Sequence, residues 1–400
     1  MTPSKPWQTI SFAVANANLS GGASIFVHAG TYTENISCGG HSGPLCMNRS
    51  GPSTTQRFRI ECDTQWSVPS SSGCLLRNSS SSGGMIANAN NVDIVGFDYT
   101  NPNSSVGAEA RCTATSGQCP QGNSVHLMNN YLHDIGQNVN DDLGGPGCPS
   151  FGAIFVGSTQ HSPAFQTDIQ IIGNRISNYG DQTKALRNGG SCNFTQGIYI
   201  NTPGAVVENN IVIQAVAYGI HFYSAPCNGV ISNNTVDQAG KSNIIVGGGD
   251  CSPQGKITIN NNILGAAPSG GIFLGASGVA PCTSSSRIKI SNNLFASGST
   301  QINGSLNGCT DVSGSLTEAP TTTFVSYSPT SRTNDYHLKA GSQAISRGTI
   351  ACTSGVSNCV NPLDFDRITR LSPPSIGSYE FGRASGESPG APSGLTATVQ

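Results

Sequence analysis

Four residues in the middle of this 400-residue chain could carry acid–base chemistry. His221 lies in the segment GIHFY and Tyr199 in the similar segment GIYIN, so the two hold equivalent places. Asp181 and Lys241 lie in the loops before two segments of this kind. A histidine or tyrosine can take or give a proton, and a nearby lysine can neutralise a substrate carboxylate. His221, Tyr199, Asp181 and Lys241 are therefore the candidate catalytic residues.

Two reactions fit such residues. A uronate lyase needs a base and a cation, whereas a glycoside hydrolase needs two carboxylates, about 5–5.5 Å apart for retention or about 6.5–9.5 Å for inversion. The sequence supplies residues for either reaction. Each charged side chain also has a simpler interpretation as a solvated loop residue.

Tyr199 and His221 belong to short segments of the form Gly-aliphatic-x-aliphatic. Because side chains alternate faces along a strand, inward aliphatic residues put their neighbours outside. The predicted outer stripe consists of Phe155, Tyr199, His221, Ile245 and Phe273. Sugars stack on exposed rings, so the expected substrate-binding residues are Phe155, Tyr223, Phe273, Lys184 and Arg187. The alternative is that long loops cover the stripe and bury it as a separate apolar cluster.

A repeat explains how the stripe is positioned. Six aliphatic segments end in asparagine, at intervals of about 24 to 31 residues in the later repeats, which indicates stacked units that bury one shared core. The alternation of apolar and polar residues is typical of strands. An asparagine in each unit can hydrogen-bond along the stack and accept a left-handed turn. The sequence predicts an all-β fold, a right-handed parallel β-helix solenoid. The six segments are Val125–Asn130, Ile169–Asn174, Val206–Asn210, Val230–Asn234, Ile257–Asn262 and Ile288–Asn293.

Composition limits the partners. Charged residues make up 10% of the chain, and the net charge is −2 without a basic or acidic run. Nucleic acid and anionic membranes bind clustered Lys and Arg, so neither is expected as a partner. No apolar run is long enough for a membrane span. We expect a polysaccharide or glycan partner and a monomeric protein.

The 14 cysteines can be grouped into seven pairs whose members are near neighbours in the sequence. An even number of loop cysteines favours disulfides in an oxidising compartment, so the protein is expected to be extracellular, either secreted or attached to the cell surface. No CxxC pair or histidine cluster suggests zinc. No cofactor is expected, although calcium stays possible without a clear motif. The pairs expected from proximity are Cys38/Cys46, Cys62/Cys74, Cys112/Cys119, Cys148/Cys192, Cys227/Cys251, Cys282/Cys309 and Cys352/Cys359.

The two ends carry further signals. Lys5–Ser20 has apolar residues at helical spacing and predicts a helix, near Trp7–Asn18, that caps one end of the solenoid. The solenoid is expected from about Ser24 to Tyr379. Residues 1–382 would form one domain, residues 383–390 a linker, and residues 391–400 the start of another module.

Several of these segments resemble a known group. KPWQTI followed by GTYTE, and the later segments DYHLKAGSQAIS, DFDRITR and IGSYEF, are similar to the opening and closing motifs of secreted pectate-lyase-like β-helix proteins. APSGLTATVQ at the end resembles the first strand of a fibronectin type III module. The first resemblance implies the fold, but it leaves the activity open because the group includes lyases, hydrolases, epimerases and non-catalytic surface proteins. Two functions therefore remain: a carbohydrate-active lyase or hydrolase, or a non-catalytic rod that binds glycan or is structural.

Overall fold

The computed structural model describes most of the chain between residues 7 and 382. The described ranges are 7–63, 73–78, 83–114, 117–141, 145–158, 164–185, 192–224, 227–248, 257–276, 288–298, 302–304, 310–350 and 361–382. Three of the expected cysteine pairs, Arg187 and the segment after Gly382 lie wholly or partly outside these ranges.

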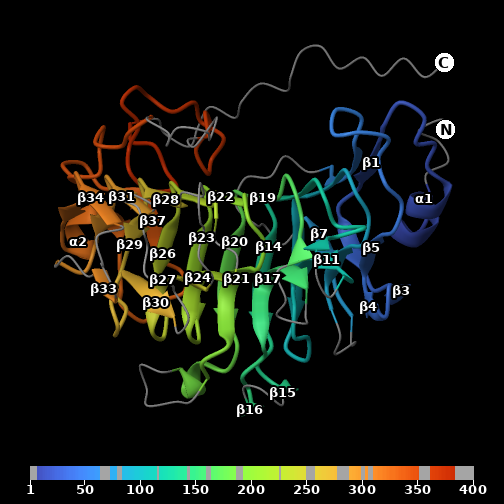
Figure 1. Ribbon diagram of the computed structural model, residues 1–400, viewed down its shortest axis with the longest axis horizontal. Coiled ribbons are helices and arrows are strands. Elements are labelled where there is room, and N and C mark those ends of the chain that lie inside the picture. Colours follow the sequence, from blue (N-terminus) through green and yellow to red (C-terminus); the bar gives the residue numbers. More distant parts are fainter. Residues whose placement is uncertain are drawn as a thin grey trace.

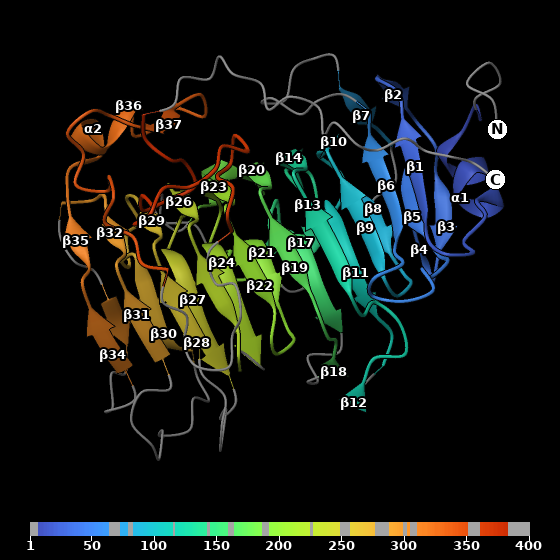
Figure 2. The same ribbon diagram turned by 90° about the horizontal axis from the view of Figure 1, so that it is seen from above.

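Three long sheets wind around one axis, and every pair of neighbouring strands in them is parallel (Figures 1 and 2). Each coil up to β33 contributes one strand to each sheet, and the last described coil contributes β34 and β35 to the first two, so the fold is the predicted right-handed parallel β-helix. The first sheet contains β1 (Ala23–Val27), β6 (Phe58–Cys62), β9 (Val92–Val95), β13 (Val125–Met128), β19 (Gln170–Ile172), β22 (Val206–Glu208), β25 (Val230–Ser232), β28 (Ile257–Asn260), β31 (Ile288–Ser291) and β34 (Thr310–Ser313). The second contains β2 (Gly30–Tyr32), β7 (Cys74–Leu76), β10 (Phe97–Asn101), β14 (Tyr131–Ile135), β20 (Arg175–Tyr179), β23 (Ile211–Ala215), β26 (Thr235–Asp237), β29 (Ile263–Leu264), β32 (Leu294–Phe295) and β35 (Leu316–Thr317). The third contains β5 (Leu45–Met47), β8 (Met85–Ala87), β11 (Ala108–Cys112), β17 (Phe151–Ser158), β21 (Thr195–Ile200), β24 (Tyr218–Ser224), β27 (Ser242–Gly248), β30 (Ile272–Ala276) and β33 (Ile302–Gly304).

Several short strands and helices lie outside the three long sheets. The pairs β3–β4, β15–β16 and β36–β37 are antiparallel, and β12–β18 is parallel. Their bounds, with those of the helices, are β3 (Ile36–Cys38), β4 (His41–Gly43), β12 (Gly117–Gln118), β15 (Asn140–Asp141), β16 (Gly145–Pro146), β18 (Ala164–Phe165), β36 (Phe324–Ser326), β37 (Asp335–Leu338), α1 (Ile10–Asn16), α2 (Pro320–Thr323) and the 3-10 turn η1 (Gln182–Lys184).

Asparagines stack between the first and second sheets as the repeat predicts. The Asn210 side chain donates to Asn234 Oδ1 at 3.0 Å, and the same bond links the other neighbours. The left-handed residue is the one before each ladder asparagine, such as Asn209 with φ 56°. The prediction gave both roles to one asparagine. In the structure the ladder asparagine forms the hydrogen bonds along the stack, and the residue before it adopts the left-handed conformation.

The helix α1 covers the open N-terminal end of the core. Thr9 caps it through the Phe12 N–H, and the Glu34 carboxylate accepts from the N–H groups of Ile10 and Ser11 at 2.6 and 2.9 Å. Buried Ile10, Ala13 and Val14 face the solenoid core. The predicted capping helix is confirmed, with bounds shorter than expected.

The C-terminal part differs from the prediction that coils continue to Tyr379. The coils end at β35, and the chain from Pro320 onward folds back over outward apolar residues of the second sheet. Phe324, Tyr336 and Tyr379 pack there against Ile211 and Ile263, because the outer faces of β23 and β29 are apolar and need a cover.

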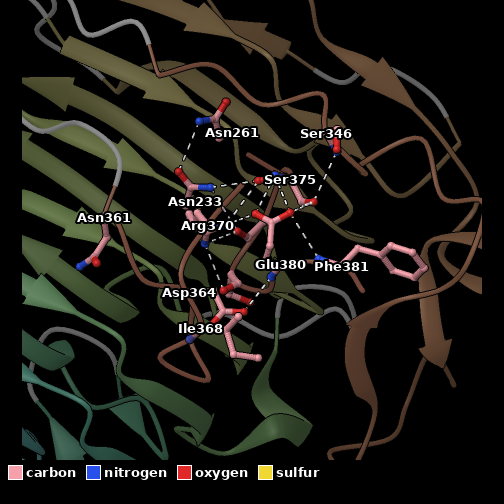
Figure 3. A network of polar contacts seen from close by, with 12 residues as sticks. Asn233, Asn261, Ser346, Asn361, Asp364, Ile368, Arg370, Ser375, Glu380 and Phe381 are labelled. Atoms are coloured by element: carbon pink, nitrogen blue, oxygen red, sulfur yellow. Dashed lines mark hydrogen bonds and ion pairs between the residues drawn. The ribbon is translucent and has the colours of Figure 1, made fainter. Parts of the chain in front are cut away.

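A buried polar network fastens this covering segment (Figure 3). Arg370 donates to Asn209 Oδ1 at 2.7 Å and to the Gly377 carbonyl at 2.9 Å, and it lies 3.7 Å from Glu380. Asn233 donates to two carbonyls of the same segment. The closing motif found in the sequence is thus the part of the chain that attaches to the turns between the first and second sheets.

Four of the expected disulfides lie within the described residues. They are Cys38–Cys46, Cys62–Cys74, Cys112–Cys119 and Cys148–Cys192. Cys227 is also disulfide-bonded. The remaining expected partners fall outside the described ranges.

Candidate functional site

The third sheet aligns the predicted stripe one residue per coil. Phe155 pairs with Tyr199, Tyr199 with His221, His221 with Ile245, and Ile245 with Phe273. The preceding isoleucines, from Ile154 to Ile272, lie in the solenoid core, whereas the stripe residues other than His221 lie in separate apolar clusters outside it. The alternation of faces along these strands is as predicted.

The rings of the stripe are close neighbours. The centroids of Phe155 and Tyr199 are 5.6 Å apart, and those of Tyr199 and His221 are 5.0 Å apart in a stacked arrangement. Tyr218 and Tyr223 add rings at 5.4 and 5.6 Å from His221. The result is an aromatic surface over three consecutive coils.

Most of this surface is covered. Phe155, Tyr199 and Ile245 are buried, and only Tyr223 and Phe273 are partly exposed. Val106 and Phe151 pack over Phe155 and Tyr199. The structure therefore contains the satellite clusters that the sequence analysis held as the alternative to an open groove.

His221 is the unusual member of the stripe. Its side chain is buried, and within the described part of the chain neither ring nitrogen has a hydrogen-bond partner. Burial lowers the pKa of His221 to about 3, so the imidazole is neutral at physiological pH. Burial also raises the pKa of Tyr199, with a further contribution from Tyr223, so its hydroxyl stays protonated.

The charged candidate residues differ in whether they contact the rings of the stripe. Lys241 Nζ lies 5.4 Å from the centroid of the Tyr218 ring, which in turn contacts His221. Asp181 caps the turn η1 by accepting from the N–H and hydroxyl of Thr183, at 2.9 and 2.8 Å, and Lys184 in that turn is exposed. Lys241 is thus placed beside the ring cluster, whereas the Asp181 carboxylate has a local structural role.

Sequence reasoning missed a carboxylate on the same face. Glu109 pairs with Phe155 in the third sheet and is buried. Its carboxylate lies 3.0 Å from His41 Nδ1 and 3.5 Å from Arg111 Nη1. In the segment GAEAR (107–111) small alanines flank Glu109, whereas larger apolar residues flank the stripe residues of the later coils, so the aliphatic pattern did not single out Glu109.

Two further properties bear on cofactors and location. Within the ranges that the structure describes, no group of three or more His, Cys, Asp or Glu side chains is placed to hold a metal ion. None of the described helices has the length and apolar composition to cross a membrane.

Fold and stripe together define a parallel β-helix with an aromatic outer surface. Searches against protein-family models and among curated proteins find no match. Among solved structures, the pectate lyase Pel9A is similar with 15% identity and a TM-score of 0.46, over 92% of this chain and 90% of that one. The A-module of the mannuronan C-5 epimerase AlgE4 from Azotobacter vinelandii is similar with 12% identity and a TM-score of 0.42, over 78% of this chain and 91% of that one. At these identities the likeness is one of fold alone.

Proposed function

We propose that this chain is an extracellular carbohydrate-active β-helix protein that acts on a polysaccharide along the third-sheet stripe. The observation that carries the proposal is His221. A buried polar group without a partner costs about 1–3 kcal/mol, and its apolar neighbour Ile245 shows that the fold does not need a polar group here. A ligand that bonds to the imidazole would account for that cost.

An elimination would use the neutral form of His221 as the base and the protonated form of Tyr199 as the acid, with the low pKa making this imidazole a weak base. Neutral His221 would take the proton from the sugar carbon next to a carboxylate, and the electron pair of that bond would form the new double bond. The bond to the leaving oxygen would break, and the Tyr199 hydroxyl would protonate that oxygen. Lys241 would balance the charge of the substrate carboxylate.

A hydrolytic reaction is the other form of the same proposal. It needs two carboxylates, and the candidates are Asp181 from the predicted set and Glu109 on this face. Either reaction would use Phe155, Tyr223 and Phe273 as stacking surfaces, and Lys184 and Arg187 stay predicted substrate-binding residues, of which Arg187 lies outside the described ranges. Because Tyr223 and Phe273 are partly exposed, a sugar chain would first contact the stripe there.

A second candidate is a non-catalytic rod that binds glycan or serves a structural role. The burial of Phe155, Tyr199 and Ile245 favours it, since covered rings cannot stack on a sugar without a movement of the cover. Under both candidates the disulfides support an extracellular location.

Two product assays on a panel of polysaccharides separate these possibilities. Absorbance at about 235 nm reports the unsaturated product of elimination, and new reducing ends without that absorbance report hydrolysis. His221→Ala should abolish either signal while circular dichroism stays native. Tyr199→Ala should weaken binding by about 1–2 kcal/mol, by analogy with aromatic pairs.

The outcomes are distinct. Glycan binding without any product would support the rod. No binding to any polysaccharide, or full activity in the His221→Ala variant, would contradict the proposal that this stripe acts on carbohydrate.

A further inference from the structure

A second surface lies on the outer face of the first sheet, where β1, β6, β9, β13 and β19 run side by side (Figure 2). The strand register places two rows of side chains along it, which together form the first-sheet band. Five coils at about 4.8 Å give a band about 19 Å long. The polar row is Ser24, Arg59, Asp93, His126 and Gln170, and the second row is Phe26, Glu61, Val95, Met128 and Ile172, which is apolar except for Glu61.

Ion pairs run along the polar row. Arg59 contacts Glu61 at 2.7 Å and Asp93 at 3.8 Å. His126 lies between two carboxylates, with Nδ1 3.2 Å from Asp93 and Nε2 3.4 Å from Asp168. Burial alone would lower the pKa of His126, but the bonds to Asp168 and Asp93 outweigh it and raise the pKa.

Part of this network has a clear structural role. Arg57 donates to Asp93 at 2.6 Å, to the Ser124 hydroxyl at 2.6 Å, and to the carbonyls of Val92 and Ser124 at 2.9 and 2.7 Å. These bonds tie three successive coils together. They explain why Arg57 and Asp93 are nearly buried.

The structural role does not explain the exposed side chains of the band and of Asp168, which lies beside it two residues before Gln170. Phe26 is 61% exposed, and the side chains of Asp168 and Arg59 are 40% and 33% exposed. An exposed phenyl ring gains stability when a partner covers it. Polar groups held in place by neighbours offer directed hydrogen bonds at little entropic cost.

The charges of the band nearly cancel. Arg57, Arg59 and His126 face Glu61, Asp93 and Asp168, and Arg367 of the covering segment interacts with Glu61 and Arg59. The excess is at most one positive charge, which is lost when His126 is neutral. Polyanions need clustered positive charge, so this surface does not fit them.

We propose that the first-sheet band binds an uncharged polysaccharide. A pyranose chain has apolar C–H faces and hydroxyl-bearing edges. The band offers Phe26, Met128 and Ile172 as exposed or partly exposed apolar side chains beside the polar row, with Val95 between them buried. The Phe26 ring would stack on a sugar face, and Arg59 and Asp168 would bond to hydroxyl groups. This surface is separate from the third-sheet stripe, so the inference goes beyond the function proposed above.

Calorimetric titration with defined hexasaccharides tests the proposal. The probes are cellohexaose, xylohexaose and mannohexaose as neutral chains and hexagalacturonate as an acidic chain. We expect binding of at least one neutral probe, weakened about fivefold by Phe26→Ala and measurably by Asp168→Asn. Phe12→Ala is the matched control, because Phe12 is a similarly exposed phenyl (55%) on the capping helix.

Each other result overturns the inference. Those results are no binding of a neutral probe, equal weakening by Phe12→Ala and Phe26→Ala, or preference for hexagalacturonate in a manner that depends on Phe26. Tyr223→Ala distinguishes the two surfaces. If Tyr223→Ala abolishes all binding and Phe26→Ala changes nothing, the third-sheet function stands and the band is not a binding site.

Discussion

At the scale of single residues, His221 is the side chain whose presence lowers the stability of the fold and is best explained by a function. Its ring packs between Tyr199 and Tyr223, yet within the described chain both nitrogens are unpaired. A group kept only for packing would be better replaced by an apolar ring. The unpaired imidazole is therefore the residue on which the proposed activity depends.

The variant His221→Phe should separate stability from activity. The ring volume is retained and the unpaired nitrogens are removed, so the free energy of unfolding should rise by about 1–3 kcal/mol. Activity on polysaccharide should be lost in the same variant. Chemical denaturation measures the first effect, and a clear loss of stability would show that the imidazole has a structural partner.

The ladder asparagines give the opposite case, in which a polar side chain is structural. Asn210 is fully buried, donates to Asn234 and to the Ile171 carbonyl, and accepts from the Asn174 N–H and side chain. Asn210→Ala would leave several buried groups unpaired and should cost at least about 2 kcal/mol in urea unfolding. The exposed Asn16→Ala variant serves as the control, and equal losses in both variants would contradict the ladder's role.

At the scale of elements, much could be predicted from sequence because the repeat is local. The aliphatic runs before each asparagine became strands of the first sheet, and the Gly-aliphatic segments became strands of the third. The burial of the stripe could not be predicted. Val106 packs with Phe155, and the spacing of residues along the sequence does not show that these two residues meet in the fold. Glu109 was missed for a different reason: its coil has the glycine, Gly107, but small alanines stand where larger apolar residues flank each stripe residue in the later coils.

The disulfides differ in the length of chain that they close. Cys148–Cys192 spans 44 residues and Cys112–Cys119 spans 7. Loop entropy in the unfolded chain predicts that removing the longer one by serine substitution costs about 1.5 kcal/mol more than removing the shorter one. Urea unfolding of the two double variants measures this difference, and a larger loss for the shorter loop would argue against the entropic account.

The covering segment contains a histidine whose titration should affect stability. His337 lies 2.8 Å from Asp366 and also pairs with Asp335. Burial alone would lower its pKa, but the hydrogen bonds to these carboxylates outweigh it and raise the pKa to about 9.

Because the folded pKa exceeds the ordinary value of about 6.5, the stabilisation is complete below that pH and is lost as the pH rises toward 9. We expect the melting temperature to fall over this window, and to fall less in His337→Gln. Parallel pH profiles of the two proteins would contradict the assignment.

At the scale of the whole molecule, a solenoid offers long outer faces, and this one uses them differently. The covering segment closes much of the second sheet, apolar clusters occupy most of the third-sheet stripe, and the first-sheet band is partly open. Each face repeats at about 4.8 Å, so each could follow a polymer along the axis. The sequence shows this periodicity but not which face is covered.

The most direct test of the central claim is a crystal structure of the protein with a bound acidic or neutral hexasaccharide. The account predicts sugar rings along the third sheet, stacked on Tyr223 and Phe273, with a ring nitrogen of His221 within hydrogen-bond distance of the sugar. A structure in which the saccharide leaves this face empty and His221 keeps its apolar cover would contradict it.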